Sequence, residues 1–482
     1  MLSKLKTFAQ DINKELDGIL YLVGGSVRDM IMNIAPKDYD LELFRVWPKD
    51  FVKYLDKKKI PFKFNSDAKF PVYRVCIVNN LLDDEEWVEV GFPRVDNKTG
   101  PKHSDFECLV DPFMSVIDAA MRRDFTINAV YYNLLKDDYE NHGFVSHITH
   151  SRELSPVHME KFKEDPLRIM RGFQFASRFG LYTADTLETV DVDMINGLSH
   201  VDPSGIYAEF VKGITKAKNI TNALEYLCSI ALRNNGSEFF KPITEMFYCL
   251  QNARHHFEGN VWEHTKLVIK NAIELADTDD EKVLLFFAAF FHDIGKIPTF
   301  KLDTAGNPTA HGHDVEGDDL VELYGSRFGL PKKMIKQIIV LKHCHMIGND
   351  AKNKKLYLMA EELEKVGLNF DILCKLMLAD VYGSVKEYFR STVRSHGEIY
   401  NFMAKIKSLG IELKPLRMFV SGDDILYHSN GKIKGKKLGD LLYEMKMLQI
   451  NNRVATRQEA FDFMKKRIEN ILEKIVDKET PE

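Results

Sequence analysis

One stretch near the N-terminus, Tyr21–Phe44, constrains the fold of this chain more than any other. It reads YLVGGSVRDMIMNIAPKDYDLELF: an apolar strand, a glycine pair, a helix start with an Arg-Asp pair, and a second strand with two aspartates. Gly24 and Gly25 lack a Cβ, so backbone N–H groups can approach phosphate oxygens, and the positive end of the next helix would point at them. Asp38 and Asp40 are two apart, so on a strand both carboxylates would emerge on one face.

The same spacing indicates a phosphate site beside a metal site. Arg28 falls in the first turn of the predicted helix and offers a planar fork of donors for phosphate. Two carboxylates on a rigid strand suit two Mg²⁺ ions for in-line phosphoryl transfer. A glycine pair alone is weak support, and a lone Asp-x-Asp is usually a loop or a helix cap. The combination is far more specific and predicts a site for a nucleotide triphosphate and Mg²⁺.

This stretch resembles the head-domain signature of the class II nucleotidyltransferases, which comprise CCA-adding tRNA nucleotidyltransferases and bacterial poly(A) polymerases. In that family the two aspartates hold the catalytic metals, and the Gly-Gly-x-Val-Arg-Asp turn binds the triphosphate. The resemblance therefore implies metal ligands at Asp38 and Asp40. It implies a triphosphate site at Gly24, Gly25, Arg28 and Asp29.

A second motif extends the resemblance. Arg122–Ala129 reads RRDFTINA, an unbroken match to a motif of the same family. Taken alone, such an octet is usually the charged start of an amphipathic helix. The match implies that Arg123, Asp124 and Asn128 contact the sugar and phosphates of the incoming nucleotide.

The strand predicted at Trp87–Arg94, WVEVGFPR, carries a third acidic candidate. Its alternation places Glu89 out of phase with Val88 and Val90. A third carboxylate from a neighbouring strand often completes a polymerase-type site, and Glu89 is our candidate for it. A solvent-facing strand glutamate is an alternative of equal weight.

The segment Glu164–Arg178, EDPLRIMRGFQFASR, predicts a helix with a proline in its first turn. Asp165 and Arg168 are three apart and share a face. A carboxylate can accept from the amino group of cytosine or adenine while a guanidinium donates to the ring nitrogen. Uracil and guanine present the reverse polarity, so the pair would select C and A; a surface salt bridge is the alternative. The CCA-adding family has a templating motif that falls on Glu164, Asp165 and Arg168, with family arginines at Arg171 and Arg178.

The second half of the chain is rich in histidine. It contains WEHT at Trp262–Thr265, FHDIGKI at Phe291–Ile297 and LAD at Leu378–Asp380. A histidine, a His-Asp pair and a later aspartate on three helices can converge in a bundle core. Imidazole with carboxylate suits a transition metal such as Mn, Co, Ni, Fe or Zn. The pattern resembles the HD phosphohydrolase superfamily, which implies metal ligands at His264, His292, Asp293 and Asp380 and a phosphate contact at Lys296.

Two histidine clusters, AHGHDVEG and KHCHMIG, lie between these motifs. His313 and His343 are candidates for second-metal ligands, at even odds against surface or capping histidines. Some bacterial CCA-adding enzymes carry an HD domain with phosphatase and 2′,3′-cyclic phosphodiesterase activity. The resemblance implies the same activity here, because a polymerase needs a free 3′ hydroxyl and a phosphate-blocked end must first be cleared.

The C-terminal part carries a weaker signal. Phe419–Leu426, Gly431–Gly439 and Ala455–Ala460 resemble the corresponding part of HD-containing family members. The lysines of the glycine-rich loop would meet tRNA phosphates as flexible point charges, or they simply belong to a solvated loop. These lysines are Lys432, Lys434, Lys436 and Lys437.

Length and pattern set the domain plan. At 482 residues, the chain is too long to fold around a single hydrophobic core. Strand patterns crowd the first part, and helical periodicity follows. We therefore expect a multidomain protein: an α/β nucleotidyltransferase head with a mixed sheet, then all-α domains. The expected bounds are 1–140 for the head, 141–255 for a helical body that templates the base and binds RNA, 256–390 for the HD domain and 391–482 for a helical tRNA-binding region.

Composition excludes some settings. The hydrophobic fraction of 45% and the charged fraction of 28% are typical of a soluble globular protein. No apolar run approaches membrane-spanning length, and the N-terminus lacks the apolar core of a signal peptide, so we expect a cytoplasmic protein without a membrane partner. Six scattered cysteines without a C-x-x-C pair predict reduced thiols. Because the net charge is −5, RNA binding requires positive charge to be concentrated locally.

The resemblance implies template-independent addition of C, C and A to the 3′ end of tRNA from CTP and ATP, with release of pyrophosphate. It also implies that the head uses Mg²⁺. A poly(A) polymerase, or an enzyme that adds only part of CCA, shares the head motifs and stays open as an alternative. A phosphohydrolase whose head merely binds RNA is disfavoured because no head carboxylate is missing. A regulatory nucleotide-binding module conflicts with two complete metal sites.

Overall fold

The computed structural model describes residues 1–64, 72–78, 86–98, 100, 106–140, 143–234, 237–253, 256–384, 396–451 and 453–479. These residues form two compact units. Unit 1 comprises Met1–Tyr248 together with Glu322–Pro331, and unit 2 comprises Cys249–Val321 together with Lys332–Glu482. The chain therefore returns to unit 1 for one short segment before it completes unit 2. The bounds of the four predicted domains stay a prediction.

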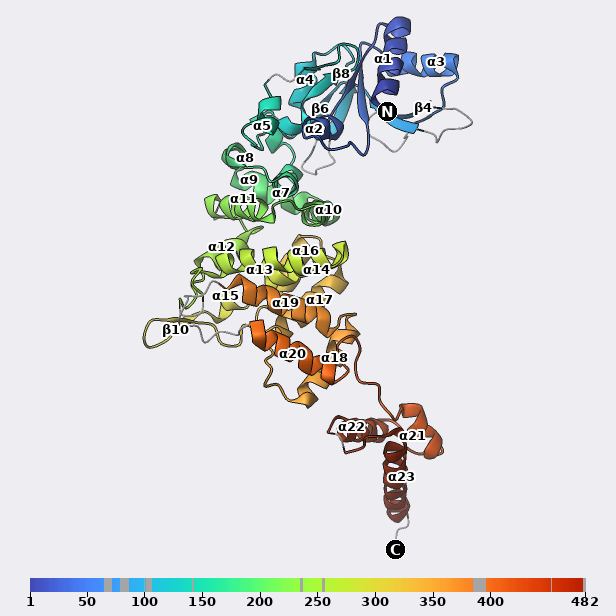
Figure 1. The fold of residues 1–482 in the computed structure, drawn as a ribbon, viewed down its shortest axis with the longest axis vertical. Helices are drawn as coiled ribbons and strands as arrows, with labels where there is room; N and C mark the ends of the chain where they lie inside the picture. The colour runs from blue at the N-terminus through green and yellow to red at the C-terminus, as the bar shows by residue number, and fades with distance from the viewer. Residues whose placement is uncertain are drawn as a thin grey trace. The chain divides into compact units, whose positions relative to one another are not determined.

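Unit 1 begins with an α/β head, as predicted (Figure 1). In the described residues its main sheet has the strand order β3-β4-β5-β2-β1-β8-β9. The sheet is mixed, because β2 pairs in parallel with β5 whereas the other strand pairs of the described residues are antiparallel. A separate hairpin joins β6 to β7. The strands are β1 (Ile19–Leu22), β2 (Asp40–Phe44), β3 (Phe62–Phe64), β4 (Tyr73–Val78), β5 (Glu86–Gly91), β6 (Arg94–Lys98), β7 (Phe106–Val110), β8 (Tyr131–Asn133) and β9 (Asp138–Glu140).

Burial explains why the central strands form. Leu20, Leu22, Leu41, Leu43 and Val90 are all at most 2% exposed, so β1, β2 and β5 share one apolar core. The helices α1 (Leu2–Leu16) and α3 (Pro48–Lys58) lie side by side, joined by several side-chain contacts (Figure 1). The short helices α2 (Gly25–Ile31) and α4 (Val116–Met121) complete the head.

The rest of unit 1 is helical. Helix α7 packs on both α10 and α11, and glycines allow these helices to approach closely. A Cβ at Gly172 would lie 2.5 Å from the hydroxyl of Tyr226, and one at Gly213 would lie 2.7 Å from the ring of Phe173. The helices are α5 (Val145–Thr149), α6 (Met159–Lys163), α7 (Leu167–Phe179), α8 (Ala184–Thr189), α9 (Val192–Gly197), α10 (Pro203–Thr215), α11 (Ile220–Arg233) and α12 (Lys241–Tyr248).

The segment Glu322–Pro331 supplies part of the core of unit 1. Phe328 is 1% exposed, and its ring centroid lies 5.5 Å from that of Phe210 and 5.7 Å from that of Phe239. A Cβ at Gly329 would lie only 2.0 Å from the carbonyl oxygen of Pro203. The segment is therefore packed tightly against the helical part of unit 1.

Unit 2 is a helical bundle in which α13 packs against both α14 and α19. Helix α14 is apolar on all sides from Val283 to Phe291, which is typical of a fully buried helix. At Gly383 a Cβ would lie 2.6 Å from the side chain of Val268, so α19 approaches α13 closely. The elements are α13 (Val261–Leu275), α14 (Asp279–Phe291), α15 (Lys296–Thr299), β10 (Lys301–Leu302), β11 (Pro308–Thr309), α17 (Lys332–Cys344), α18 (Asn353–Lys365), α19 (Phe370–Gly383) and α20 (His396–Ser408). Helix α16 (Asp318–Arg327) begins in unit 2, and its residues from Glu322 onward belong to unit 1.

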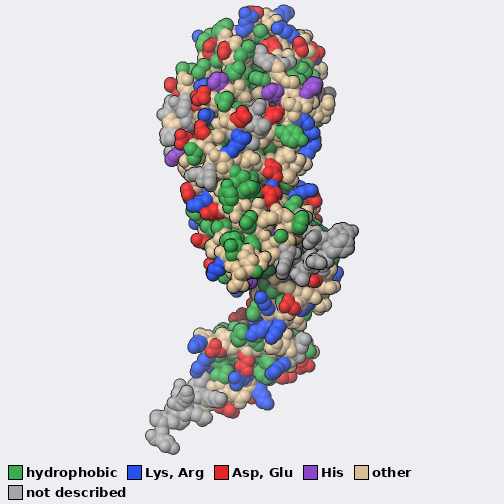
Figure 2. Space-filling model, turned by 90° about the vertical axis from the view of Figure 1, so that its left-hand side faces the viewer, with side chains coloured by type: hydrophobic (Ala, Val, Ile, Leu, Met, Phe, Trp, Pro, Cys, Tyr) green, Lys and Arg blue, Asp and Glu red, His purple; other side chains and the backbone are tan. Residues whose placement is uncertain are grey.

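The last three helices have a hydrophobic cluster of their own, which includes Ile425, Leu441 and Met464. They are α21 (Gly422–His428), α22 (Lys436–Ile450) and α23 (Arg457–Glu479). Figure 2 shows Lys and Arg side chains together with acidic ones on the surface of this C-terminal part. The predicted RNA-contacting lysines 432, 434, 436 and 437 are exposed.

Two features bear on the predicted setting. The six cysteines are free thiols, and all are buried except the half-buried Cys108. Within the described ranges, no helix combines the length and apolar character needed to cross a membrane.

Candidate active sites

The glycine pair lies at the turn between β1 and α2. Gly24 caps α2 with φ of 66°, a left-handed conformation that glycine adopts without strain. A Cβ there would lie 3.2 Å from Nη1 of Arg123 and 3.8 Å from Oδ2 of Asp40. The turn therefore brings one cation and one carboxylate close to the start of the helix.

Behind this turn a buried chain of polar contacts connects the two head motifs. Arg28 donates from Nε and Nη2 to Oδ1 of Asp29, at 2.9 and 2.6 Å, and from Nη1 to Oδ1 of Asn128 at 2.8 Å. Asn128 in turn donates to Oδ1 of Asp124 at 3.0 Å, and Arg171 donates to the other oxygen of Asp124 at 2.6 Å. Burial alone would raise the pKa of Asp124, but the charge of Arg171 keeps it lowered. These residues therefore form a pre-organised, charged wall.

The carboxylates of Asp40 and Glu89 lie on the neighbouring parallel strands β2 and β5, as register partners. Both residues are exposed on the same side of the sheet. Burial and then the nearby Glu89 raise the pKa of Asp40, with a further contribution from Asp38. A bound divalent cation would relieve this repulsion, so the donor set fits such an ion. Asp38 precedes β2 instead of lying within it, contrary to the expectation of one shared strand.

A fourth acidic residue, Glu42, was missed by sequence reasoning. It lies two positions after Asp40 on β2 and is 2% exposed. Its carboxylate pairs with Nη2 of Arg122 at 2.6 Å and Nη2 of Arg123 at 3.1 Å, and accepts from the hydroxyl of Tyr131 at 2.7 Å. Burial opposes ionisation, but the two arginines outweigh it and hold the pKa of Glu42 at about 2. The alternation of Asp38, Asp40 and Glu42 along the sequence could have indicated that Glu42 belongs to the same acidic group.

The predicted template pair lies at the N-terminal end of α7. Nε of Arg168 lies 4.0 Å from Oδ2 of Asp165, and their side chains are 14% and 13% exposed, which does not fit a solvated surface pair. Backbone carbonyls hold the guanidinium: it donates to Lys161 at 2.5 Å and to Arg122 at 2.9 Å. Asp165 accepts from the backbone N–H of Leu167 at 3.1 Å. Both side chains are thus fixed before any base arrives.

A cavity of about 550 Å³ brings most of the predicted head residues together. Five predicted residues do not line this cavity: Asp29, Asp38, Glu89, Glu164 and Arg178. Glu164 pairs with Lys161 at 3.0 Å, and the guanidinium of Arg178 stacks on the ring of Phe179. Unpredicted lining residues are Arg94, Asp96, Arg122, Leu167 and Phe175. The predicted residues that line it are Gly24, Gly25, Arg28, Asp40, Arg123, Asp124, Asn128, Asp165, Arg168 and Arg171.

In unit 2 the four predicted HD residues converge from α13, α19 and the end of α14. Nε2 of His264 lies 2.9 Å from Oδ1 of Asp380 and 3.8 Å from Oδ2 of Asp293. Nε2 of His292 lies 3.3 Å from Oδ2 of Asp293 and 3.8 Å from Oδ1 of Asp380. We call this set the first metal position.

A second group shares Asp293. Nε2 of His313 lies 3.3 Å, and Nε2 of His345 3.8 Å, from the other oxygen of Asp293, Oδ1. We call Asp293, His313 and His345 the second metal position. The prediction of His343 is corrected, because its Nε2 contacts Asp318 at 3.0 Å and it lies outside the described ligand groups. His345, two residues on in the same motif, lies in the cluster instead.

The histidine orientations fit metal ligation. Nδ1 of His292, His313 and His345 contacts a backbone carbonyl three residues earlier in each case, at 2.7, 2.9 and 2.5 Å. Each Nε2 therefore faces the shared carboxylate, in the neutral tautomer that a metal ligand needs. Nε2 of His292 and Nε2 of His313 are buried without a hydrogen-bond partner. Burial, and then His292, lower the pKa of His345 to about 4, so its ring is neutral at pH 7.

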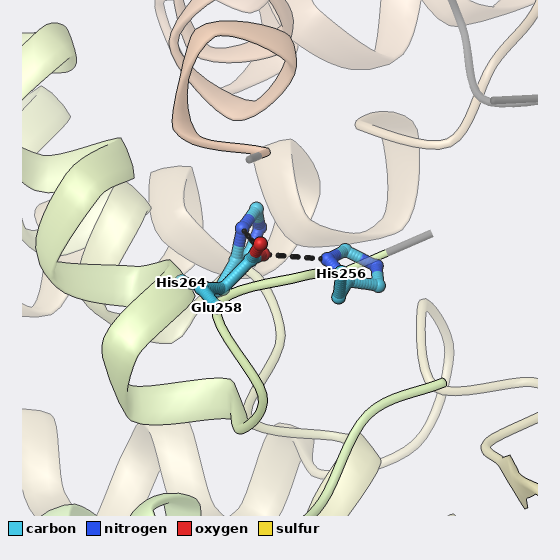
Figure 3. Close-up of side chains that lie close together, drawn as sticks. All are labelled: His256, Glu258 and His264. Carbon is cyan, nitrogen blue, oxygen red and sulfur yellow. Dashed lines mark hydrogen bonds and ion pairs between the residues drawn. The ribbon is translucent and has the colours of Figure 1, made fainter. Parts of the chain in front are cut away.

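His264 is oriented differently, by a carboxylate (Figure 3). Its Nδ1 lies 2.9 Å from Oε1 of Glu258, and Nδ1 of His256 lies 2.8 Å from the same oxygen. Burial disfavours the charged imidazole, but the contacts with Asp380 and Glu258 raise the pKa of His264 to about 9. A carboxylate that holds the far nitrogen of a ligating histidine is a common support of metal sites. Sequence reasoning missed Glu258 and His256 because single residues in a loop carry no spacing signal.

Lys296 lies where the resemblance implies a phosphate contact. Its Nζ donates to Oδ2 of Asp293 and to Oε1 of Gln251, both at 2.6 Å. A cavity of about 460 Å³ opens over the metal positions and is lined by Lys296 together with Asp293, Asp380, His313, His345 and His256. Its other walls are mostly apolar, with Leu250, Pro308, Ala310, Met346 and Val381 among the lining residues.

Comparisons with known proteins agree with this geometry. Residues 20–145 match the poly(A) polymerase head domain family, and residues 261–381 match the HD domain family. The Multifunctional CCA protein of Legionella pneumophila (strain Paris) is 26% identical over 337 residues, covering 68% of this chain and 74% of that protein. That of Pasteurella multocida (strain Pm70) is 27% identical over 364 residues, covering 73% and 79%.

Solved structures show the same fold. A CCA-adding enzyme in its apo form II has a TM-score of 0.60 at 16% identity, covering 96% of this chain and 94% of that one. The Bacillus stearothermophilus CCA-adding enzyme in complex with CTP has a TM-score of 0.57 at 16% identity, covering 98% and 99%. The chain therefore contains a poly(A) polymerase head domain and an HD domain, and it is similar over about two thirds of its length to Multifunctional CCA proteins.

Proposed function

We propose that this protein adds C, C and A to the 3′ end of tRNA, using CTP and ATP and releasing pyrophosphate. The observation that carries the proposal is the head cavity, in which the phosphate turn, a strand carboxylate and the Asp165–Arg168 pair line one space. The Multifunctional CCA proteins, which match over about two thirds of this chain, support it.

The residues of the cavity divide the work by chemistry. Gly24 and Arg123 would bind the triphosphate, because a backbone turn and a guanidinium both favour anions. Asp165 would accept from the exocyclic amino group of cytosine or adenine, while Arg168 donates to the ring nitrogen. Uracil and guanine would leave both groups without partners, which imposes the selection.

The metal would be held by Asp38, Asp40 and Glu89, whose oxygens suit Mg²⁺. When bound, Mg²⁺ supplies positive charge to the reacting phosphate. The 3′ hydroxyl of the tRNA attacks the α-phosphate of CTP or ATP, a new phosphodiester bond forms, and the bond to pyrophosphate breaks. Arg28 and the charged wall behind the turn would hold the leaving pyrophosphate in line.

In unit 2 we propose a metal-dependent phosphohydrolase that clears RNA 3′ ends blocked by a phosphate or a 2′,3′-cyclic phosphate. Imidazole and carboxylate ligands at the two metal positions favour a transition metal such as Mn, Co, Ni, Fe or Zn. When bound, such an ion supplies an activated water. Lys296 would contact the phosphate, since its ammonium group lines the cavity beside Asp293.

The head activity is tested with tRNA transcripts that end before the C-C-A, after the first C, or after both, each incubated with one nucleotide or with all four. We expect CTP alone to add two residues to the first transcript, one to the second and none to the third. ATP alone should extend only the transcript that ends in CC, and the mixture should stop after CCA. Long A tails from ATP alone would instead identify a poly(A) polymerase.

The second activity is tested on tRNA with a 2′,3′-cyclic phosphate end. The double variant His292→Ala and Asp293→Ala should lose phosphate release with Mn²⁺, Co²⁺, Ni²⁺ or Zn²⁺, yet it should add C and A to tRNA with a free 3′ hydroxyl. The reciprocal control, Asp40→Ala, should keep the hydrolysis and lose the addition. Wild-type protein that releases no phosphate with any of these metals would mean that unit 2 is only a scaffold.

A further inference from the structure

A buried lysine connects the two histidines of the second metal position. Lys342, in the last turn of α17, has a side-chain exposure of 0%. Its Nζ donates to the carbonyl oxygens of Asp314 and Glu316, at 3.0 and 2.7 Å, and lies 3.0 Å from Oδ1 of Asp318. An ammonium group has three donors, and these three acceptors match them in number.

The contacts join two separate segments of the chain. Two of the acceptors lie in the loop that directly follows His313, and the third, Asp318, is the first residue of α16. The backbone carbonyl of Lys342 itself contacts Nδ1 of His345 at 2.5 Å. The side chain of one residue therefore holds the loop of one histidine, and its backbone orients the ring of the other. Neither contact involves His264 or His292 of the first metal position.

The loop after His313 has little regular structure to hold it. It runs from the end of β11 to the start of α16 through turns, with positive φ at Gly312 and Gly317. It does have a second support, because a Cβ at Gly295 would lie only 2.0 Å from the carbonyl oxygen of His313. Burying an ammonium group is costly unless it is fully paired. The pairing of the Lys342 ammonium group with this loop and with the first residue of α16 is therefore a specific feature of the structure and not incidental packing.

We propose that Lys342 is a positioning residue for the second metal position, because it fixes His313 and His345 beside the same oxygen of Asp293. The inference rests on the two-metal centre proposed above. Removing the ammonium group would free the loop and so weaken metal binding at this position. The first position should keep its affinity, since its ligands come from α13, α19 and the end of α14.

The experiment is a titration of metal-free full-length protein with Mn²⁺, which gives the number of ions bound and the affinity of each. All proteins carry Asp40→Ala, so that the head contributes no ion, and this background serves as wild type here. Wild-type protein should bind two ions. In Lys342→Met one of the two should lose about 10- to 100-fold in affinity, the effect typical of groups that support metal ligands. The other should change by less than about threefold, a selectivity that general destabilisation does not produce.

The matched control is Lys375→Met. Lys375 is also a largely buried lysine of unit 2, 12% exposed, with three acidic partners: Asp277, Glu281 and Asp371. None of these belongs to a metal position, so both affinities should stay as in wild type. If Lys342→Met does not fold, Asp318→Asn removes the charged partner at a half-exposed site and should weaken the same ion selectively.

Three results would overturn the inference. Two ions bound by Lys342→Met with wild-type affinities would show that the lysine positions nothing. Equal losses at both positions would show a general effect on the bundle. A single ion bound by wild-type protein would remove the second metal position itself, which is a failure of the proposed centre and is visible before any variant is made.

Discussion

Replacing Glu42 by Gln should loosen the centre of the head without touching its surface. The carboxylate is 3% exposed and takes part in two ion pairs, with Arg122 and Arg123, and accepts from Tyr131. A glutamine keeps the shape, but it is neutral, and one of its two polar atoms is a donor that would face a guanidinium donor. Two half-buried arginines would then lose the carboxylate with which they pair among the described residues.

The magnitude follows from the pKa. The two arginines hold the pKa of Glu42 at about 2, against an ordinary value of 4.5. At about 1.4 kcal/mol per pKa unit, this difference corresponds to roughly 3 kcal/mol of stability. Breaking a buried pair by removing one partner costs about 3–5 kcal/mol in general, which agrees. Because the folded-state pKa is lowered, this contribution is complete above pH 4.5 and is lost as pH falls toward 2.

Hydrogen exchange read by mass spectrometry is the suitable assay, because it reports local opening in a protein with more than one unit. At pH 7, peptides from β1 and β2 should exchange on the order of 100-fold faster in Glu42→Gln than in wild type. The control Glu160→Gln, an exposed glutamate of α6, should leave these rates unchanged. Rates within about threefold of wild type in Glu42→Gln would refute the stabilising role that we assign to the buried network.

Three further predictions concern other parts of the chain. Arg168→Ala should raise misincorporation of UTP or GTP relative to CTP, since a hydrogen bond to a charged group is worth about 1.5–3 kcal/mol; wild-type selectivity in single-nucleotide assays would reject the template role. Glu258→Ala should lower the affinity of one Mn²⁺ site about 10- to 100-fold in a titration. An unchanged affinity would show that Glu258 contributes only to packing. Gly295→Ala should lower the melting temperature of unit 2, measured by calorimetry, because the new Cβ would lie 2.0 and 2.5 Å from the carbonyl oxygens of His313 and Glu316. An unchanged melting temperature would show that this loop can move away from the new Cβ at no cost in stability.

Much of the head could be predicted from sequence because its site depends on short-range spacing. The order of strand, glycine pair, helix and acidic strand places Gly24, Arg28 and Asp40 around one cavity, as expected. The register of β2 with β5, which sets Glu89 opposite Asp40, depends on pairing across the sheet. Alternation along one strand indicates a face, but it does not identify the neighbouring strand.

The histidine-rich unit 2 shows what could not be predicted from the sequence. The motif KHCH indicated that a histidine there was special, yet the helix end decides which one, and His345 faces Asp293 whereas His343 faces Asp318. Glu258 gave no signal, because its role depends on a loop meeting α13 in space. Supporting residues of this kind are set by tertiary packing and carry no periodicity that a sequence reveals.

The return of Glu322–Pro331 to unit 1 has a consequence for synthesis of the chain. Phe328 fills a place beside Phe210 and Phe239, so the helical part of unit 1 cannot complete its packing when Tyr248 emerges from the ribosome. The intervening residues take on the order of 4 to 16 s to synthesise at about 5–20 residues per second. During that interval the nascent first unit exposes an apolar surface, and the segments of the second unit that carry His264, His292 and His313 are synthesised before the first unit is complete.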